Sequence, residues 1–436
     1  MSSTKLLMTF PVSATSHTLV EYRERGGYAT LEKVLRQMTP TQVNDEITAS
    51  GIQGRGGAAF PMGRKWGVIH LNDGQPHYLC ANADEGEPGT FKDRWILENA
   101  PHLLVESMVI AAYALQVRNA FVYMRGEFDL PYRRLAASVD EAYEAGYLGE
   151  RILGTDVSCD LVIYRGAGSY VCGEASALLT SIEGRKPYPR NRPPRLTVRG
   201  LYQRPTVVNN VETLANIVGI VANGAQAFRA VGTAKNPGTR LISISGHICR
   251  PGVYEIEIGY PWSKFIYEDC GGVSGGRQLK AVIPGGSSAK VLKAGETYKV
   301  KDRTITLEDI PMDFDTIAAC GSMAGSGGVI VMDDSRDMVE CLNNINEFYA
   351  HESCGQCTPC REGSLWMKKI TQRMLEGGGV VQDPATLKNV ADNIAGRTIC
   401  ALGDAAALPV KSFIKHFRDE FQHHIDQKKC LVAPYV

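Results

Sequence analysis

Four cysteines near the carboxyl end of the chain have a spacing that suits a metal cluster. Three of them lie in the run Cys354–Gly355–Gln356–Cys357–Thr358–Pro359–Cys360, and Cys400 follows after 39 further residues. Three thiolates in such a short loop can cover one face of a cubane cluster, and a fourth from elsewhere completes its ligation. The spacing therefore predicts a [4Fe–4S] cluster.

Two other interpretations of these cysteines remain open. A zinc site more often uses two separated C-x2-C pairs, and a structural or redox thiol set is the other alternative. Disulfide bonds are disfavoured, because the first three cysteines are too close in sequence to pair comfortably with one another. The other eight cysteines form no C-x2-C pair, and we predict that most of them are small buried packing residues.

A glycine-rich stretch, Gly54–Arg55–Gly56–Gly57–Ala58–Ala59–Phe60, is typical of a loop that approaches a ligand closely. Glycines let backbone N–H groups reach a phosphate or a ring, and the following Arg64 and Lys65 supply positive charge. The stretch matches a dinucleotide fingerprint, but we expect Pro61 and Gly63 to interrupt the helix that this fingerprint requires. A flexible surface loop without a ligand is the alternative.

An acidic motif, Asn82–Ala83–Asp84–Glu85–Gly86–Glu87–Pro88–Gly89–Thr90–Phe91–Lys92–Asp93–Arg94, directly follows the strand-like run Tyr78–Leu79–Cys80 and begins with the carboxylates of Asp84, Glu85 and Glu87. In α/β sheets, ligands bind at the carboxyl ends of strands. The three carboxylates are suited to binding Mg²⁺, to acid–base chemistry or to hydrogen bonding with a heterocycle and a ribose. A solvated acidic turn is the alternative.

Two further motifs follow later in the sequence. Residues 165–178 follow another strand-like run and are rich in glycine and small residues, and residues 205–213 contain the adjacent amides Asn209 and Asn210. Adjacent amides suit a polar heterocycle or a ribityl chain, although the second motif is equally consistent with a helix start capped by asparagine.

The elements that would position these motifs fall into four segments. Residues 1–50 have a helical pattern, residues 51–235 alternate strand-like and helical runs, residues 238–332 alternate like a small β domain, and residues 337–436 are helical again. Alternating strands and helices predict an α/β layer structure for the second segment.

Composition excludes several classes of protein. The 436 residues carry 47 basic and 47 acidic side chains, and this zero net charge argues against a nucleic-acid-binding protein. No apolar run reaches the 18 residues of a membrane span, so we predict no direct membrane span.

In this order, the motifs resemble the flavin-bearing, NADH-binding subunit of respiratory complex I (the F-type subunit of NADH:quinone oxidoreductase). The resemblance runs from about residue 51 to residue 421. It implies an α/β fold in which a Rossmann-like domain binds FMN and NADH. It further implies a small β-grasp (soluble ligand-binding-like) domain and a C-terminal helical bundle with the [4Fe–4S] cluster.

The resemblance also implies roles for individual residues. Phe60 would stack on adenine, Glu87 would lie near the nicotinamide, and the four cysteines would hold the cluster. The implied FMN contacts are Gly54, Gly56, Lys65, Asn82, Asp84, Glu85, Tyr170, Gly173, Glu174, Val208, Asn209, Asn210 and Thr213.

The implied activity is that of an FMN-dependent NADH dehydrogenase with NAD(H) as its nucleotide. Such an enzyme takes a hydride from NADH and passes single electrons to the [4Fe–4S] cluster. No side chain need act as a nucleophile, and we interpret Glu87 as shaping nucleotide affinity. The implied partners are a [2Fe–2S] subunit and other peripheral-arm subunits of complex I. The implied location is peripheral, on the cytoplasmic side of a bacterial inner membrane.

Four positions depart from the family pattern, the first being Ala59, where the family usually shows glycine. Ala175 stands where a glutamate usually binds the adenosine ribose, and Val68 and Arg195 stand where phenylalanines often stack on adenine. The loss of an acid and the gain of an arginine favour acceptance of a 2′-phosphate. We therefore hypothesise that this chain accepts NADPH better than its relatives do.

Two alternative functions remain. The first is a diaphorase subunit of a soluble NAD(P)-linked hydrogenase or formate dehydrogenase. Such subunits often carry extra cluster-binding domains, and we expect none here because no further cysteine group precedes residue 51 or follows Cys400. The second is a zinc-stabilised interaction module without redox chemistry.

Overall fold

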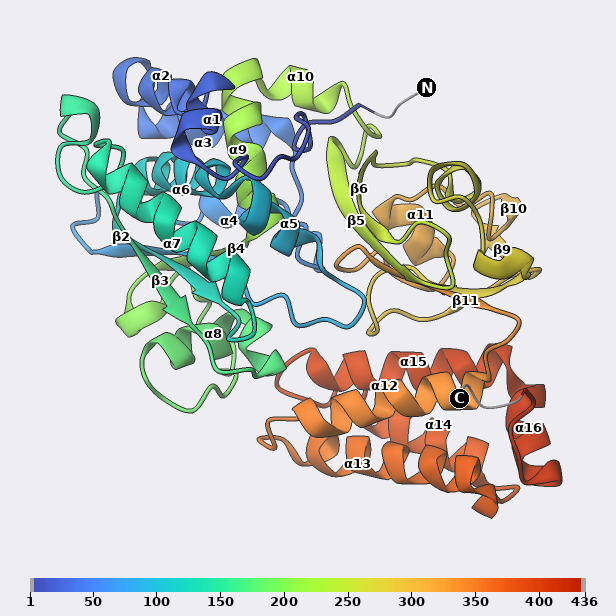
Figure 1. Ribbon diagram of the computed structural model, residues 1–436. Helices are drawn as coiled ribbons and strands as arrows, with labels where there is room; N and C mark the ends of the chain where they lie inside the picture. Colours follow the sequence, from blue (N-terminus) through green and yellow to red (C-terminus); the bar gives the residue numbers. More distant parts are fainter. Residues whose placement is uncertain (1–3, 433–436) are drawn as a thin grey trace. The chain divides into compact units, whose positions relative to one another are not determined.

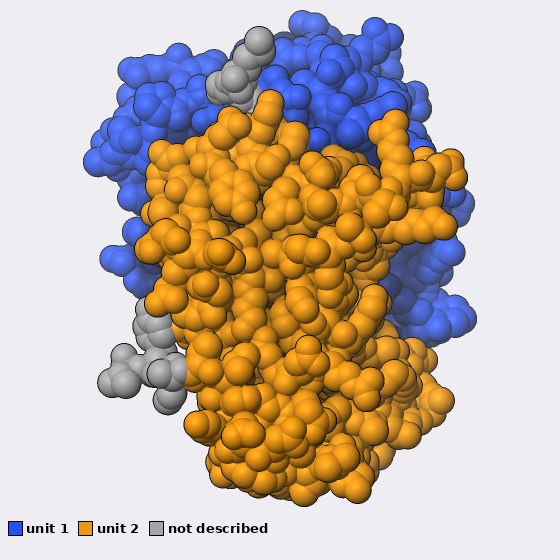
Figure 2. Space-filling view, turned by 90° about the vertical axis from the view of Figure 1, so that its right-hand side faces the viewer, with its two compact units in different colours: residues 1–86, 91–242, 253–259 blue, residues 87–90, 243–252, 260–436 orange. Residues whose placement is uncertain are grey.

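The computed structural model describes residues 4–432, and its contacts divide the chain into two compact units. Unit 1 comprises residues 1–86, 91–242 and 253–259, and unit 2 comprises residues 87–90, 243–252 and 260–436 (Figures 1 and 2). Residues 87–90 are therefore a short excursion of the chain from unit 1 into unit 2.

Unit 1 contains a parallel four-stranded sheet in the order β3-β2-β1-β4. Its strands are β1 (His77–Ala83), β2 (Val117–Met124), β3 (Asp160–Arg165) and β4 (Thr206–Asn210). Five of the seven residues of β1 are buried, as expected for a parallel strand covered on both faces. The α/β architecture predicted from the alternating pattern is present.

Helices connect and cover these strands. Helix α6 is buried almost all round, which follows from its nearly continuous apolar sequence. The helices and short 3-10 turns between β1 and the end of unit 1 are α5 (Lys92–Asn99), α6 (Pro101–Leu115), α7 (Asp129–Glu144), η1 (Ile152–Gly154), η2 (Tyr170–Gly173), α8 (Ala175–Ile182), η3 (Leu201–Gln203), α9 (Val211–Asn223) and α10 (Ala225–Arg229).

The first fifty residues form helices α1 (Leu19–Glu24), α2 (Ala29–Gln37) and α3 (Pro40–Ser50), followed by the short α4 (Met62–Trp66). The long helix that the dinucleotide fingerprint requires does not follow the glycine-rich stretch, since α4 has only 5 residues and ends at Trp66. Pro61 precedes the first turn, where no backbone N–H is required. Gly63 is needed inside the helix, because a Cβ there would lie only 2.4 Å from the Thr48 hydroxyl oxygen.

A buried carboxylate joins the N-terminal helices to α6. Glu106 is fully buried and accepts hydrogen bonds from the backbone N–H groups of Tyr28 (2.8 Å) and Leu31 (2.9 Å). It also accepts one from the Tyr22 hydroxyl at 2.5 Å. These donors have no access to water, so they depend on this single side chain.

Replacement of Glu106 by leucine should therefore leave three buried donors without an acceptor. We expect a loss of about 4 kcal/mol in the free energy of unfolding, measured by urea denaturation. The matched control is Glu32→Gln, which breaks only an exposed ion pair with Arg36. Equal midpoints for the two variants would contradict this account of Glu106.

The second sheet is mixed and has five strands in the order β6-β5-β11-β7-β8. Strand β11 pairs parallel with β5 and antiparallel with β7. Its strands are β5 (Thr239–Gly246), β6 (Gly252–Glu257), β7 (Leu279–Ile283), β8 (Leu292–Lys293) and β11 (Gly328–Asp333). The same stretch of chain holds η4 (Lys264–Asp269), η5 (Ser274–Gly276), the hairpin β9 (Thr297–Val300) and β10 (Arg303–Thr306), and α11 (Phe314–Ala319).

The chain then forms helices α12 (Met338–Glu352), α13 (Thr358–Arg373), η6 (Met374–Gly378), α14 (Asp383–Ile394), α15 (Leu402–His416) and α16 (Arg418–Gln427). A break at Phe417 separates α15 from α16. No helix among residues 4–432 is both long and apolar enough to cross a membrane.

One compact group of polar side chains in these helices is explained by helix capping. Asp337 caps α12 by accepting from the N–H groups of Val339 and Glu340, and its other oxygen accepts from His424 Nε2 at 2.9 Å. Cys430 lies beside this pair. Burial alone would lower the pKa of His424, but the hydrogen bond with Asp337 raises it.

Candidate functional site

The glycine-rich stretch forms a closed loop whose ends are tied together. Gly54 N–H donates to the Phe60 carbonyl at 2.9 Å, and Met62 N–H donates to the Ile52 carbonyl at 2.9 Å. A Cβ on Gly56 would lie 2.9 Å from Asn210 Cβ, so only glycine allows this approach. The Phe60 side chain is about half exposed (49%).

Three hydrogen bonds join this loop to the end of β4 and the start of α9. Lys65 Nζ donates to the Val208 carbonyl at 2.8 Å, and Trp66 Nε1 donates to Asn209 Oδ1 at 3.1 Å. The backbone N–H of Arg55 donates to Thr213 Oγ1 at 2.8 Å. The first and fourth sequence motifs therefore meet, although about 150 residues separate them.

The second and third motifs meet in the same way. Asn82, near the end of β1, donates from Nδ2 to the Gly173 carbonyl at 2.9 Å. A Cβ on Gly173 would lie 3.3 Å from the Asp84 carbonyl oxygen, and a Cβ on Gly86 would lie 3.2 Å from the Tyr170 ring. All the predicted FMN-contacting residues thus belong to unit 1.

Three of the predicted side chains have structural tasks at helix starts. Both carboxylate oxygens of Glu85 accept backbone N–H groups at the start of α5, from Asp93 (2.8 Å) and Arg94 (3.0 Å). Glu174 caps α8 and pairs with Arg192 at 2.8 Å. Asn210 caps α9, which agrees with the alternative interpretation of the fourth motif.

A buried charge network behind this region was not predicted. Lys92 Nζ lies 2.8 Å from Asp93 Oδ1 and 2.7 Å from Glu212 Oε2, and all three side chains are buried. Burial alone would lower the pKa of Lys92, but Asp93 and Glu212 raise it above its usual range. Burial and the Asp93 charge raise the pKa of Glu85 to about 8. Lys92 and Asp93 belong to the acidic motif of the sequence, but nothing in that motif indicated their pairing with Glu212.

Two positively charged side chains, Lys65 and Arg192, lie near each other at the site. Burial lowers the pKa of Lys65 to about 8, and repulsion from Arg192 contributes to this shift. An anionic group bound beside Lys65 would favour its charged form.

Glu87 lies in unit 2, two residues after Glu85. Its Oε1 atom accepts from the Ser288 backbone N–H at 2.7 Å and from the Ser287 hydroxyl at 3.2 Å. The carboxylate is therefore held in one position by residues that follow β7.

The four predicted cluster cysteines lie in segments between helices or in the first turn of a helix. Cys354 follows α12, Cys357 is the residue before α13, Cys360 lies in its first turn and Cys400 precedes α15. None forms a disulfide. Burial and the other three thiols raise the pKa of Cys400 to about 11, so the four sulfur atoms share one neighbourhood.

The prediction for the remaining cysteines was only partly correct. Four of them are buried, namely Cys80, Cys159, Cys172 and Cys270. Cys320, Cys341 and Cys430 are half-buried, and Cys249 is exposed. Apolar neighbours in the sequence did not ensure burial, because a turn such as the one that holds Cys249 lies on the surface.

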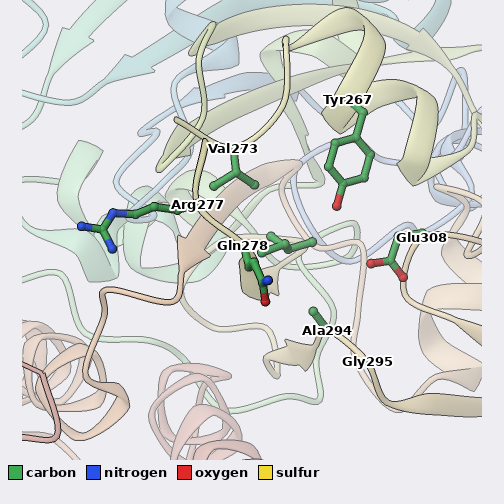
Figure 3. A pocket seen from close by; sticks show the side chains of 8 residues that line it. Tyr267, Val273, Arg277, Gln278, Ala294, Gly295 and Glu308 are labelled. Carbon is green, nitrogen blue, oxygen red and sulfur yellow. The ribbon is translucent and has the colours of Figure 1, made fainter. Parts of the chain in front are cut away.

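A separate surface pocket lies in the sheet region of unit 2 (Figure 3). Tyr267, Gln278 and Glu308 line it, whereas the Arg277 guanidinium points away from Tyr267 and Glu308. None of the residues predicted for the flavin, the nucleotide or the cluster lines this pocket.

Three family descriptions match the chain in sequence order. Residues 47–219 match the Nuo51 FMN-binding domain, residues 240–331 match the SLBB domain, and residues 340–424 match the NADH-ubiquinone oxidoreductase-F iron-sulfur binding region. The chain thus carries an FMN-binding domain and a [4Fe–4S]-binding region.

Solved structures of similar chains include an NAD⁺-reducing [NiFe]-hydrogenase in its air-oxidised and H₂-reduced states. The TM-scores are 0.81 and 0.80 at 33% identity, over 96% of this chain. The match covers 68% and 66% of the hydrogenase chains, so it spans about two thirds of their length.

Relatives of nearly equal length are more similar in sequence. The second F-type subunit of the NADH-quinone oxidoreductases of Rhizobium meliloti is 46% identical over 95% of this chain and 96% of the relative. The F-type subunit of Streptomyces coelicolor is 45% identical (96% and 90%), and that of Mycobacterium tuberculosis is 44% identical (97% and 93%). With both cofactor-binding regions matched, the chain belongs to the family of F-type NADH-quinone oxidoreductase subunits.

Proposed function

We propose that this chain is the NADH-oxidising, FMN-dependent subunit through which electrons enter a quinone-reducing respiratory complex. One observation carries the proposal. Four motifs from distant parts of the sequence meet at the carboxyl ends of β1 and β4, in a chain that also gathers four cysteines in its helical region. The family match to both cofactor-binding regions supports the same conclusion.

The residues at the ends of β1 and β4 fit a flavin mononucleotide. Gly56 leaves its backbone open beside Asn210, and the half-buried Lys65 lies where a phosphate would relieve its repulsion from Arg192. When bound, FMN accepts a hydride from NADH and releases the electrons singly, as a [4Fe–4S] cluster requires. The residues that we propose to hold it are Gly54, Gly56, Lys65, Asn82, Asp84, Glu85, Tyr170, Gly173, Glu174, Val208, Asn209, Asn210 and Thr213.

For the nucleotide, we propose that Phe60 stacks on adenine and that Glu87 lies near the nicotinamide. The half-exposed ring of Phe60 is available for stacking. The Glu87 carboxylate has a fixed orientation, so it can contribute to nucleotide affinity without transferring a proton.

The assembly and location of the complex are also part of the proposal. We propose that the chain docks on a [2Fe–2S] partner among the peripheral-arm subunits, on the cytoplasmic side of a bacterial inner membrane. The relatives' names identify them as subunits of a larger enzyme, which supports an assembly of this kind.

A diaphorase subunit of an NAD⁺-reducing hydrogenase is the second candidate, because two such structures share the fold. The identity of 44–46% to relatives named as F-type NADH-quinone oxidoreductase subunits, against 33% to the hydrogenase chain, favours the first candidate. Identification of the neighbouring subunits by affinity purification from the source cells separates the two functions.

The cofactor assignment predicts a defined spectrum. The purified chain should show flavin absorbance and a broad brown iron–sulfur band, with iron and sulfide in equal amounts. Cys400→Ser should lose the iron–sulfur band and keep the flavin. Cys249→Ser, at an exposed cysteine outside the set, should keep both. A colourless protein that contains zinc would refute the redox function.

The lowered pKa of Lys65 predicts a pH dependence for flavin binding. A phosphate favours charged Lys65, so above pH 8 FMN binding must take up a proton, and the FMN dissociation constant should rise up to tenfold per pH unit. Lys65→Met should bind FMN about 10- to 100-fold more weakly at pH 7, without this pH dependence. Flavin fluorescence titration measures both effects. The exposed Lys235→Met is the control, and a flat wild-type profile would contradict the role of Lys65.

From the residues at the start of α8 we predict whether the chain prefers NADH or NADPH. Ala175 is the first residue of α8, and the adjacent Glu174 carboxylate is engaged in the cap and with Arg192. The Glu174 carboxylate is therefore not available to repel the 2′-phosphate of NADPH at this position. We expect substantial NADPH oxidation by the wild type, and Ala175→Glu should lower kcat/KM for NADPH at least tenfold relative to NADH. A strong NADH preference in the wild type would exclude this hypothesis.

A further inference from the structure

The turn that carries Glu87 is packed on the sheet region of unit 2. Ser287 N–H donates to the Pro88 carbonyl at 3.1 Å, and the Thr90 and Ser326 hydroxyls lie 2.5 Å apart. Gly286 adopts φ +91°, and a Cβ there would lie 2.5 Å from Glu87 Cγ. The loops after β7 and before β11 therefore hold residues 87–90 on both sides.

Ser287 connects this turn to the helical region. Its hydroxyl oxygen lies 3.2 Å from Glu87 Oε1 and 2.9 Å from the Tyr349 hydroxyl oxygen. A carboxylate only accepts hydrogen bonds, so Ser287 donates to Glu87 and Tyr349 donates to Ser287. Ser287 and Tyr349 are both buried (1% and 0% exposed), and hydrogen bonds in such a chain strengthen one another.

Tyr349 lies in the last turn of α12, five residues before Cys354. Helix α12 leads into the predicted cluster loop, and its Tyr349 hydroxyl donates to the Ser287 hydroxyl. Ser287 in turn orients the Glu87 carboxylate. No motif in the sequence indicated Ser287 or Tyr349.

We propose that Ser287 and Tyr349 are positioning residues for nucleotide binding, through a hydroxyl chain that fixes the Glu87 carboxylate from α12. This inference rests on the proposed nucleotide role of Glu87. Without the Ser287 hydroxyl, or without the Tyr349 hydroxyl that orients it, the Glu87 carboxylate is less firmly held, and nucleotide binding must restore its order at a cost in affinity.

The test measures NAD⁺ dissociation constants of the cofactor-loaded, purified complex by calorimetry. Ser287→Ala and Tyr349→Phe should each weaken NAD⁺ binding about fivefold, as expected for a coupling of about 1 kcal/mol. Ser287→Thr keeps the hydroxyl and should restore most of the affinity. The controls are Ser412→Ala and Tyr298→Phe, which remove hydroxyls elsewhere in unit 2 and should have no effect.

A double-mutant cycle separates positioning from general damage. In a Glu87→Gln background, Ser287→Ala and Tyr349→Phe should cause little further loss, because the residue that they position has already changed. Full additivity, or unchanged affinity in both single variants, would overturn the inference.

Glu87→Gln alone tests the underlying proposal. If it leaves NAD⁺ affinity unchanged, the nucleotide role of Glu87 fails. If it changes the affinity while the Ser287 and Tyr349 variants do not, only the present inference fails.

Discussion

The parallel pairing of β1 with β4 is the constraint on which the candidate site depends. Their register places Asn82 opposite Asn210, so both strands end at the same edge of the sheet. The acidic motif after β1 and the start of α9 after β4 are therefore neighbours before any side chain makes a contact. Arg55 of the glycine loop and Lys65 of α4 bind the start of α9 and the end of β4, and the buried Lys92 network ties α5 to α9. A flavin site built this way gains its precision from backbone geometry.

Unit 2 adds two features to the same chemistry. Its helical region brings together four cysteines, three from segments between helices and Cys360 from the first turn of α13. Its sheet region holds the Glu87 turn, the only part of the acidic motif that leaves unit 1. The SLBB domain thus has a structural task within this chain, because the loops around β7 and β11 orient a proposed nucleotide-binding carboxylate.

Much of the site could be predicted because its signals are local. The C-x2-C-x2-C run, the glycine stretch and the strand–acidic-motif order each depend on residues close in sequence. The features that were missed depend on distant pairs. Glu212 neutralises Lys92 from 120 residues away, and Tyr349 orders Ser287 from 62 residues away, so no local pattern records either contact. The need for glycine at position 63 also depends on a distant residue, because a Cβ there would meet Thr48.

The central claim is that this chain alone conducts electrons from NADH to its cluster. Anaerobic titration of the cofactor-loaded chain with NADH, followed by visible absorption and EPR, tests that claim most directly. The account predicts that NADH bleaches the flavin band and produces the EPR signal of a reduced [4Fe–4S] cluster. A flavin that remains oxidised, or a cluster that NADH cannot reduce although dithionite can, would contradict it.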